Sequence, residues 1–111
     1  MANTFKQLGQ ARENSTNAVS VYSPAASTET IIKSIIVANT TASDVAVRIF
    51  VDDDGTTYDE STAIMYDVDV PANGNLTIDE PICMNDSSGN LAYRSATANA
   101  LTITVSGIEI T

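Results

Sequence analysis

Two consecutive β-branched runs, IIKSIIVAN from Ile31 and DVAVRIFV ending at Val51, limit what this chain can fold into. In the second run every other residue from Val45 to Val51 is Val or Ile, which is the period of a strand with one buried face. Only Thr40 to Ser43 join the two runs. The pattern therefore predicts a hairpin at the centre of a β-sheet.

The first run, within residues 29–39, is apolar on both faces. Its Ile residues also match a helical stripe, but its β-branched side chains favour a strand. A strand that is apolar on both faces is either central or has an outer face that meets another chain. Because Ile31 to Ala38 needs cover on both faces, we expect a homo-oligomer, with a trimer favoured.

Further strands are predicted at 18–22, 64–70, 76–83 with an interruption at Pro81, 91–94 and 101–110. Asp-Gly and Asn-Gly pairs and Pro residues separate them. The predicted fold class is all-β, a two-sheet antiparallel β-sandwich that is jelly-roll-like, with an extended N-terminal arm. The expected core residues are Ile35, Val47, Ile49, Tyr66, Val68, Leu101 and Ile103.

The run from Ile64 to Val70 alternates most regularly. Ile64, Tyr66 and the two Val residues share one phase, which we expect to be buried. Asp67 and Asp69 share the other phase with Met65. Two acids at this spacing also occur in hydrolases, but on an exposed strand face they are expected to be solvated edge charges.

The last strand changes phase. Leu101, Ile103 and Val105 keep one phase, whereas Ile108 and Ile110 keep the other. A β-bulge at residue 107, a Gly, would return the two isoleucines to the core face. The alternative is a strand that passes from one sheet or subunit to another at that point.

The first sixteen residues differ from the rest of the chain. Apart from the initial Met, Phe5 and Leu8 are their only large apolar residues, and Lys6 and Arg12 give this segment a net charge of +1 while the remainder carries −10. The predicted organisation is an arm at 1–16 and a sandwich domain at 17–111. We expect Phe5, Lys6, Leu8 and Arg12 to bind a partner protein or a neighbouring subunit; a tail without function is the alternative.

Composition excludes several functions. The net charge of −9 would repel a nucleic-acid backbone, and no apolar run approaches the ~20 residues that cross a bilayer. The chain contains no His, so the usual general base is missing, and it has no recognisable nucleophile or phosphate-binding motif. We expect neither catalysis nor a cofactor, and we expect the lone Cys83 to be a small buried hydrophobe.

An acidic turn at Asp52–Gly55 suggests calcium, because clustered carboxylates before a Gly can surround a hard cation. With Gly55 at the sixth position of an EF-hand loop, the first and twelfth positions fall on Phe50 and Ser61. Neither residue supplies a carboxylate. The turn is therefore predicted to be a structural loop, with no metal site.

Several segments together resemble small virion proteins of tailed bacteriophages, in particular head decoration or capsid cement proteins. The segments are TFKQLGQ, VYSPAAS, IIKSIIVANTTAS, RIFVDDDGTTYDE, MYDVDVPANGNL and TANALTITVSGIEIT, which span nearly the whole chain. They are turn and strand signatures rather than chemical motifs. The resemblance therefore points to a lineage more directly than to a place in the virion.

The resemblance implies a small, usually trimeric or dimeric β-sandwich on the capsid exterior that clamps neighbouring major capsid protein subunits. Such a protein would be assembled in the cytoplasm of the host bacterium. A tail, collar or fibre-associated module that binds a receptor or glycan is the alternative, and a lectin-like or regulatory domain is a third possibility. Glycan binding would call for aromatic loops, where this sequence offers only Tyr58 and Tyr93.

Overall fold

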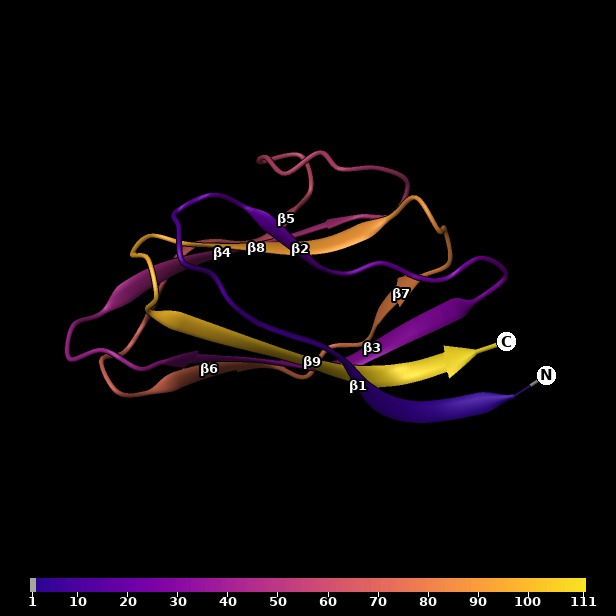
Figure 1. The fold of residues 1–111 in the computed structure, drawn as a ribbon, viewed down its shortest axis with the longest axis horizontal. Coiled ribbons are helices and arrows are strands. Elements are labelled where there is room, and N and C mark those ends of the chain that lie inside the picture. Colours follow the sequence, from indigo (N-terminus) through magenta and orange to yellow (C-terminus); the bar gives the residue numbers. More distant parts are fainter. Residues whose placement is uncertain (1) are drawn as a thin grey trace.

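The computed structural model describes residues 2–111, which form two packed antiparallel sheets and no helix (Figure 1). The predicted all-β sandwich is confirmed. The strands are β1 (Asn3–Arg12), β2 (Val19–Tyr22), β3 (Glu29–Asn39), β4 (Val45–Asp52), β5 (Ala63–Val70), β6 (Asn75–Ile78), β7 (Ile82–Met84), β8 (Asn90–Ser95) and β9 (Leu101–Ile110).

One sheet, here called sheet A, has the order β1-β9-β3-β6, and β7 also pairs with β3. The other, sheet B, has the order β2-β8-β4-β5. Alternating residues of both sheets meet in one apolar core, as expected where two sheets pack face to face. Its largest fully buried side chains are Tyr93, Ile32, Ile35, Ile49, Met84, Leu91, Leu101, Ile103, Val37, Val47, Val70 and Val105.

The predicted hairpin between β3 and β4 is wrong. The strands lie in different sheets, and residues 40–44 carry the chain from one to the other. The buried side chain of Asn39 holds this connection, because its Nδ2 donates to the carbonyls of Ser43 (2.8 Å) and Val70 (3.0 Å) while its Oδ1 accepts the Thr41 N–H (2.9 Å). Each run has a strongly apolar face, and the crossing sets these faces opposite one another across the core.

The expected N-terminal arm does not lie apart from the body. Residues 3–12 form β1, which pairs with β9 along its whole length, and the two chain ends lie side by side in Figure 1. Beyond the last strand pair, Ala2 and Thr111 exchange backbone hydrogen bonds of 3.0 and 2.9 Å. Mainly backbone pairing fixes β1, and only Leu8 and Ala11 pack against the core, so its sequence lacks the apolar alternation of a buried strand.

Strand β5 departs from its regular sequence pattern. Tyr66 and Asp67 together lie opposite the single residue Arg48 of β4, which is a β-bulge, and Asp67 has the left-handed backbone angle φ of 54°. The bulge reverses the phase, so Met65 packs against the core and Ile64 faces outward. The predicted core positions of Tyr66 and Val68 are wrong, since each is 38% exposed. The bulge turns Tyr66 outward, whereas Val68 keeps the register of Val47 but lies on the edge strand of sheet B. The other five predicted core residues are buried.

The irregularity predicted at Gly107 exists, but the extra residues lie on the neighbouring strands. Leu8 of β1 and Lys33 of β3 are the residues inserted at this level, and β9 itself continues without a break. A Cβ on Gly107 would collide with the carbonyl oxygen of Ile31. Because β9 keeps its phase, Ile108 and Ile110 are not returned to the core as predicted; they lie on the outer face of sheet A.

Candidate interaction surface

An apolar row crosses the outer face of sheet A. The register pairs Phe5 with Ile108, Ile108 with Ile31, and Ile31 with Cys83, so one residue from each of β1, β9, β3 and β7 points to the same side. Phe5 is 66% exposed, the two isoleucines are half-buried, and Cys83 is exposed. The expectation that Cys83 is buried is therefore wrong.

The rest of this face is mostly uncharged. Two rows further along β9, Gln10, Thr104, Ile36 and Thr77 lie in register, and Ile36 is 40% exposed. Between the two rows the paired residues are Gln, Ser and Ser. The face thus offers methyl, hydroxyl and amide groups, a surface that another protein can cover without removing many charges from water.

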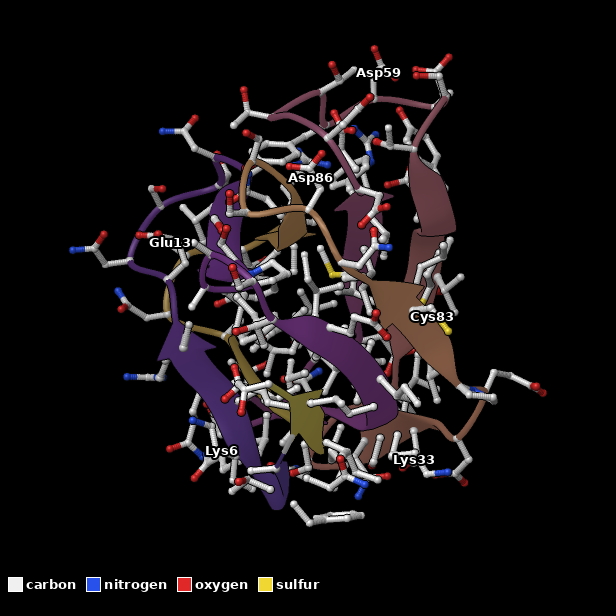
Figure 2. The ribbon with its side chains drawn as sticks, turned by 90° about the vertical axis from the view of Figure 1, so that its right-hand side faces the viewer. Lys6, Glu13, Lys33, Asp59, Cys83 and Asp86 are labelled. Atoms are coloured by element: carbon white, nitrogen blue, oxygen red, sulfur yellow. The ribbon has the colours of Figure 1, made fainter. Side chains whose placement is uncertain are left out.

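Most of the negative charge lies in the loops rather than in the strands. The strands of sheet A carry three basic and two acidic residues, whereas the rest of the chain carries two basic and twelve acidic ones. Figure 2 shows this division from one end of the sandwich, with Lys6 and Lys33 in the lower layer and Asp59 and Asp86 at the upper loops. Among the described strands, those of sheet A carry a net charge of +1 and those of sheet B −1, whereas the segments outside the strands hold nine acidic residues and no basic one.

The outer face of sheet B is covered by the chain itself. Phe50 points to this face and is only 2% exposed, because Tyr58 of the β4–β5 loop and Tyr66 pack on it with ring centroids 6.1 and 6.5 Å away. The guanidinium of Arg48 lies 4.0 Å above the Tyr66 ring. In Figure 1 this loop lies over sheet B, and no segment of residues 2–111 lies over the outer face of sheet A.

Polar contacts at one end of the sandwich attach β1 to the body. Lys6 Nζ lies 2.7 Å from a Glu109 carboxylate oxygen, and the Tyr22 hydroxyl donates to the other oxygen at 2.6 Å. The same hydroxyl lies 2.7 Å from Thr30 Oγ1. The hydrogen bonds from Lys6 and Tyr22 lower the pKa of Glu109, while burial, followed by the Glu109 contact, raises the pKa of Tyr22 to about 12.

The four residues predicted to bind a partner therefore have different surroundings. Phe5 lies on the outer face, but Lys6 is paired with Glu109, and Leu8 packs against the core. Arg12 Nη2 donates to the Asn99 carbonyl at 2.6 Å. Only Phe5 has a large apolar side chain directed to solvent, so it is the member of the set best placed for contact with another chain.

The sequence predicts an apolar outer face along Ile31 to Ala38, but it does not identify Cys83 and Ile108 as surface residues. Two signals were available: the apolar outer phase of β3, and the change of phase before Ile108. Taken alone, the change of phase suggests a bulge that would restore core packing. Both in fact indicate an outer face that is apolar where β3 and β9 lie side by side.

The acidic turn after β4 is organised by Asp52. Its carboxylate accepts backbone N–H groups of Asp54 (3.2 Å) and Thr57 (2.8 Å), which lower its pKa, the Thr57 bond contributing most. The neighbouring Asp52 raises the pKa of Asp54. Among residues 2–111, no group of three His, Cys, Asp or Glu side chains is arranged to hold a metal ion.

An open pocket of about 290 Å³ adjoins the β7 end of the apolar row. Ile31 and Cys83 belong to both, and Met84 contributes a buried side chain to the pocket. The complete lining is Glu29, Thr30, Ile31, Asp53, Cys83, Met84 and Asn85. Phe5 and this pocket thus lie at opposite ends of one row.

No protein-family model matches the chain, and no curated protein matches it significantly. In the part of the chain that the structure describes, no helix is long and apolar enough to span a membrane.

Proposed function

We propose that this protein is a non-enzymatic structural protein of a tailed-phage virion, a decoration protein that binds the capsid exterior and stabilises contacts between major capsid protein subunits. The resemblance of its strand and turn segments to such proteins motivates the proposal. The observation that carries it is the bare, nearly uncharged outer face of sheet A on an otherwise acidic sandwich. This is a suitable surface for a protein that acts by contact.

The physical role would be to add buried area across joints of a shell under internal pressure. Each Å² of apolar surface removed from water contributes about 25 cal/mol. A modest contact repeated at every joint therefore stabilises the assembled shell, because only the assembled state binds the protein. The acidic remainder would stay in water and keep the free protein soluble.

Location and partners belong to the same proposal. The protein would be made in the bacterial cytoplasm and would then bind the major capsid protein on the virion exterior as a homo-oligomer, with the trimer as the expectation from sequence. It would need neither a cofactor nor nucleic acid. In the structure the inner face of β3 is covered by sheet B, so the need for a second chain falls on the outer face alone.

The positions of Tyr58 and Tyr93 argue against a tail or fibre module that binds glycans. Tyr58 packs against Phe50, and Tyr93 is fully buried with its hydroxyl accepting the Glu13 N–H at 2.8 Å. Stacking on a sugar needs an exposed aromatic face. The two tyrosines named as glycan-binding candidates instead serve the packing of this fold.

Localisation in the particle tests the proposal. Phage particles that encode this chain would be purified intact and with their tails removed, and quantitative mass spectrometry would give its amount relative to the major capsid protein. We expect the ratio to be the same in both preparations, and the protein to be released by mild treatment that leaves the shell closed. Loss of the protein together with the tails would place it in the tail and contradict the proposal.

A further inference from the structure

We propose that two copies of this chain bind each other through the outer faces of sheet A, related by a two-fold axis parallel to the strands. Phe5 of each copy would contact Cys83 and Ile31 of the second copy, and Ile108 would pack on Ile31 of the second copy. This inference deepens the proposed function, on which it rests, by naming a second copy as the occupant of this face. The pair would be the form of the free protein, and on the shell the same face would bind the capsid in place of the second copy.

Charge permits a second copy on this face more readily than elsewhere on the molecule. Each chain carries −9, so two copies repel wherever their acidic surfaces meet. The strands of sheet A carry a net charge of +1. A contact through their outer faces keeps the acidic β4–β5 loop, which lies over sheet B, on the far side of each copy, where water and salt screen it.

The direction of the axis follows from the position of the row. A two-fold axis in the plane of the interface and parallel to the strands reverses the strand order, so β1 lies over β7 of the second copy and β9 over β3. The row Phe5–Ile108–Ile31–Cys83 then lies over the same row, and the sheets overlap along their full length. An axis across the strands at this row, which lies near one end of β1 and β9, would leave most of both faces uncovered.

The same axis brings the most exposed apolar side chain close to a pocket. Phe5 is the most exposed large apolar side chain of the described residues, and the pocket of about 290 Å³ adjoins Ile31 and Cys83 at the other end of the row. Reversal of the strand order sets each Phe5 at the pocket end of the second copy. One contact repeated twice is what an isologous dimer requires.

The available area predicts a dimer that dissociates. Four strands at a spacing of about 4.8 Å and ten residues at about 3.4 Å each give a face of roughly 650 Å² per copy. A pair would bury about 1,300 Å² in total, close to the lower limit for a specific interface. We therefore expect dimers at high micromolar concentration and monomers on dilution.

A cysteine variant tests both the partner and the axis. In Phe5→Cys, residue 5 is separated from Cys83 of its own chain by three strand spacings, about 14 Å, which is too far for a disulfide within one chain. In the proposed pair, residue 5 faces Cys83 of the second copy. Because sheets packed face to face lie about 10 Å apart, beyond the reach of a disulfide, a short bismaleimide should join the two chains at two 5–83 pairs, identified by mass spectrometry.

The matched control is Gln10→Cys, which lies on the same face of β1 but in a different row. We expect it to cross-link at least tenfold more slowly than Phe5→Cys. Equal rates, or a main product that joins Cys83 to Cys83, would overturn the proposed axis.

Sedimentation velocity on the unmodified chain supplies the second measurement. A monomer–dimer equilibrium that Phe5→Ser shifts to monomer supports the inference. A trimer, or a monomer at submillimolar concentration, overturns it but leaves the virion proposal standing. Absence of the protein from particles would contradict the virion proposal without affecting the cross-link.

Discussion

Lys6 on β1 and Glu109 on β9 form an ion pair 2.7 Å long that joins the first strand of the chain to the last. Lys6 is half exposed, whereas the Glu109 side chain is 17% exposed and also accepts the Tyr22 hydroxyl. Lys6 lies on the edge strand β1, and a charged side chain on an edge strand discourages pairing with further strands. The same pair therefore fixes β1 and protects the open edge of sheet A.

The Glu109 contacts predict a defined loss of stability in acid. Lys6 and Tyr22 lower the folded-state pKa of Glu109 below its ordinary value of 4.5, so the folded state favours the charged carboxylate. These contacts contribute fully to the stability of the folded state at pH values above the ordinary pKa. The contribution is lost as the pH falls through the lowered pKa. Glu109→Gln should be less stable than the native chain at pH 7, and the difference should shrink in acid.

Urea unfolding at a series of pH values measures this effect. Glu80→Gln, a change at an exposed glutamate between β6 and β7, is the matched control and should follow the native profile. If Glu109→Gln and the native chain lose stability in parallel below pH 4.5, the ion pair does not have the assigned role.

Asn39 should be essential for the crossing between sheets. Asn39→Ala would leave the Val70 carbonyl without its side-chain donor and remove the acceptor of the Thr41 N–H. Leaving buried polar groups unpaired costs about 1–3 kcal/mol each, so we expect a loss of roughly 3 kcal/mol. Thermal unfolding checks this, with the exposed Ser43→Ala as a control that should change little.

The bulge in β5 should depend on the left-handed conformation of Asp67. Its carboxylate also accepts Arg48 Nε at 2.7 Å and Nη2 at 3.0 Å, which lowers its pKa. Asp67→Ala should lose both features and about 1–2 kcal/mol of stability. Asp67→Asn tolerates the same backbone angle and should lose less. Equal losses in urea unfolding would show that the backbone angle is unimportant.

Calcium should not stabilise the fold. The Asp52 carboxylate is already an acceptor for two backbone N–H groups of its own loop, and the EF-hand positions at Phe50 and Ser61 carry no carboxylate. The melting temperature should therefore be the same with chelator and with excess calcium. An increase of several degrees on adding calcium, absent with magnesium, would contradict this prediction.

Period-2 patterning identified most of the strands and the sandwich, because burial of one face is a local property of sequence. Strand β3 was predicted with its observed bounds, Glu29–Asn39. The partner of a strand is not local. The short link after Asn39 suggested a hairpin, yet hydrogen bonds from a buried Asn side chain direct the chain to the other sheet.

Bulges account for the errors at Tyr66 and at the end of β9. In β5 a single left-handed residue, Asp67, reverses the phase of a perfectly alternating segment. The sequence indicates an irregularity at Gly107, but only the pairing of β9 with β1 and β3 shows that Leu8 and Lys33 are the inserted residues. The complete candidate surface could not be predicted from the sequence, because its row is assembled from four strands that are distant in sequence.

Variants in strand β1 can separate effects on folding from effects on binding. Deletion of residues 1–16 would expose the edge of β9 and should weaken the sandwich itself. Point variants are more informative. Leu8 packs against the core, whereas Phe5 is 66% exposed, although only three positions separate them.

Leu8→Ser should lower the free energy of unfolding by about 2 kcal/mol, because it removes apolar packing and places a hydroxyl against the core. Phe5→Ser should change it by less than about 0.5 kcal/mol when measured at low concentration, where the chain is monomeric. Its effect should appear instead in self-association and, in particles, in retention on the shell. A Phe5→Ser chain that melts early at low concentration would show that Phe5 supports the fold rather than an interface.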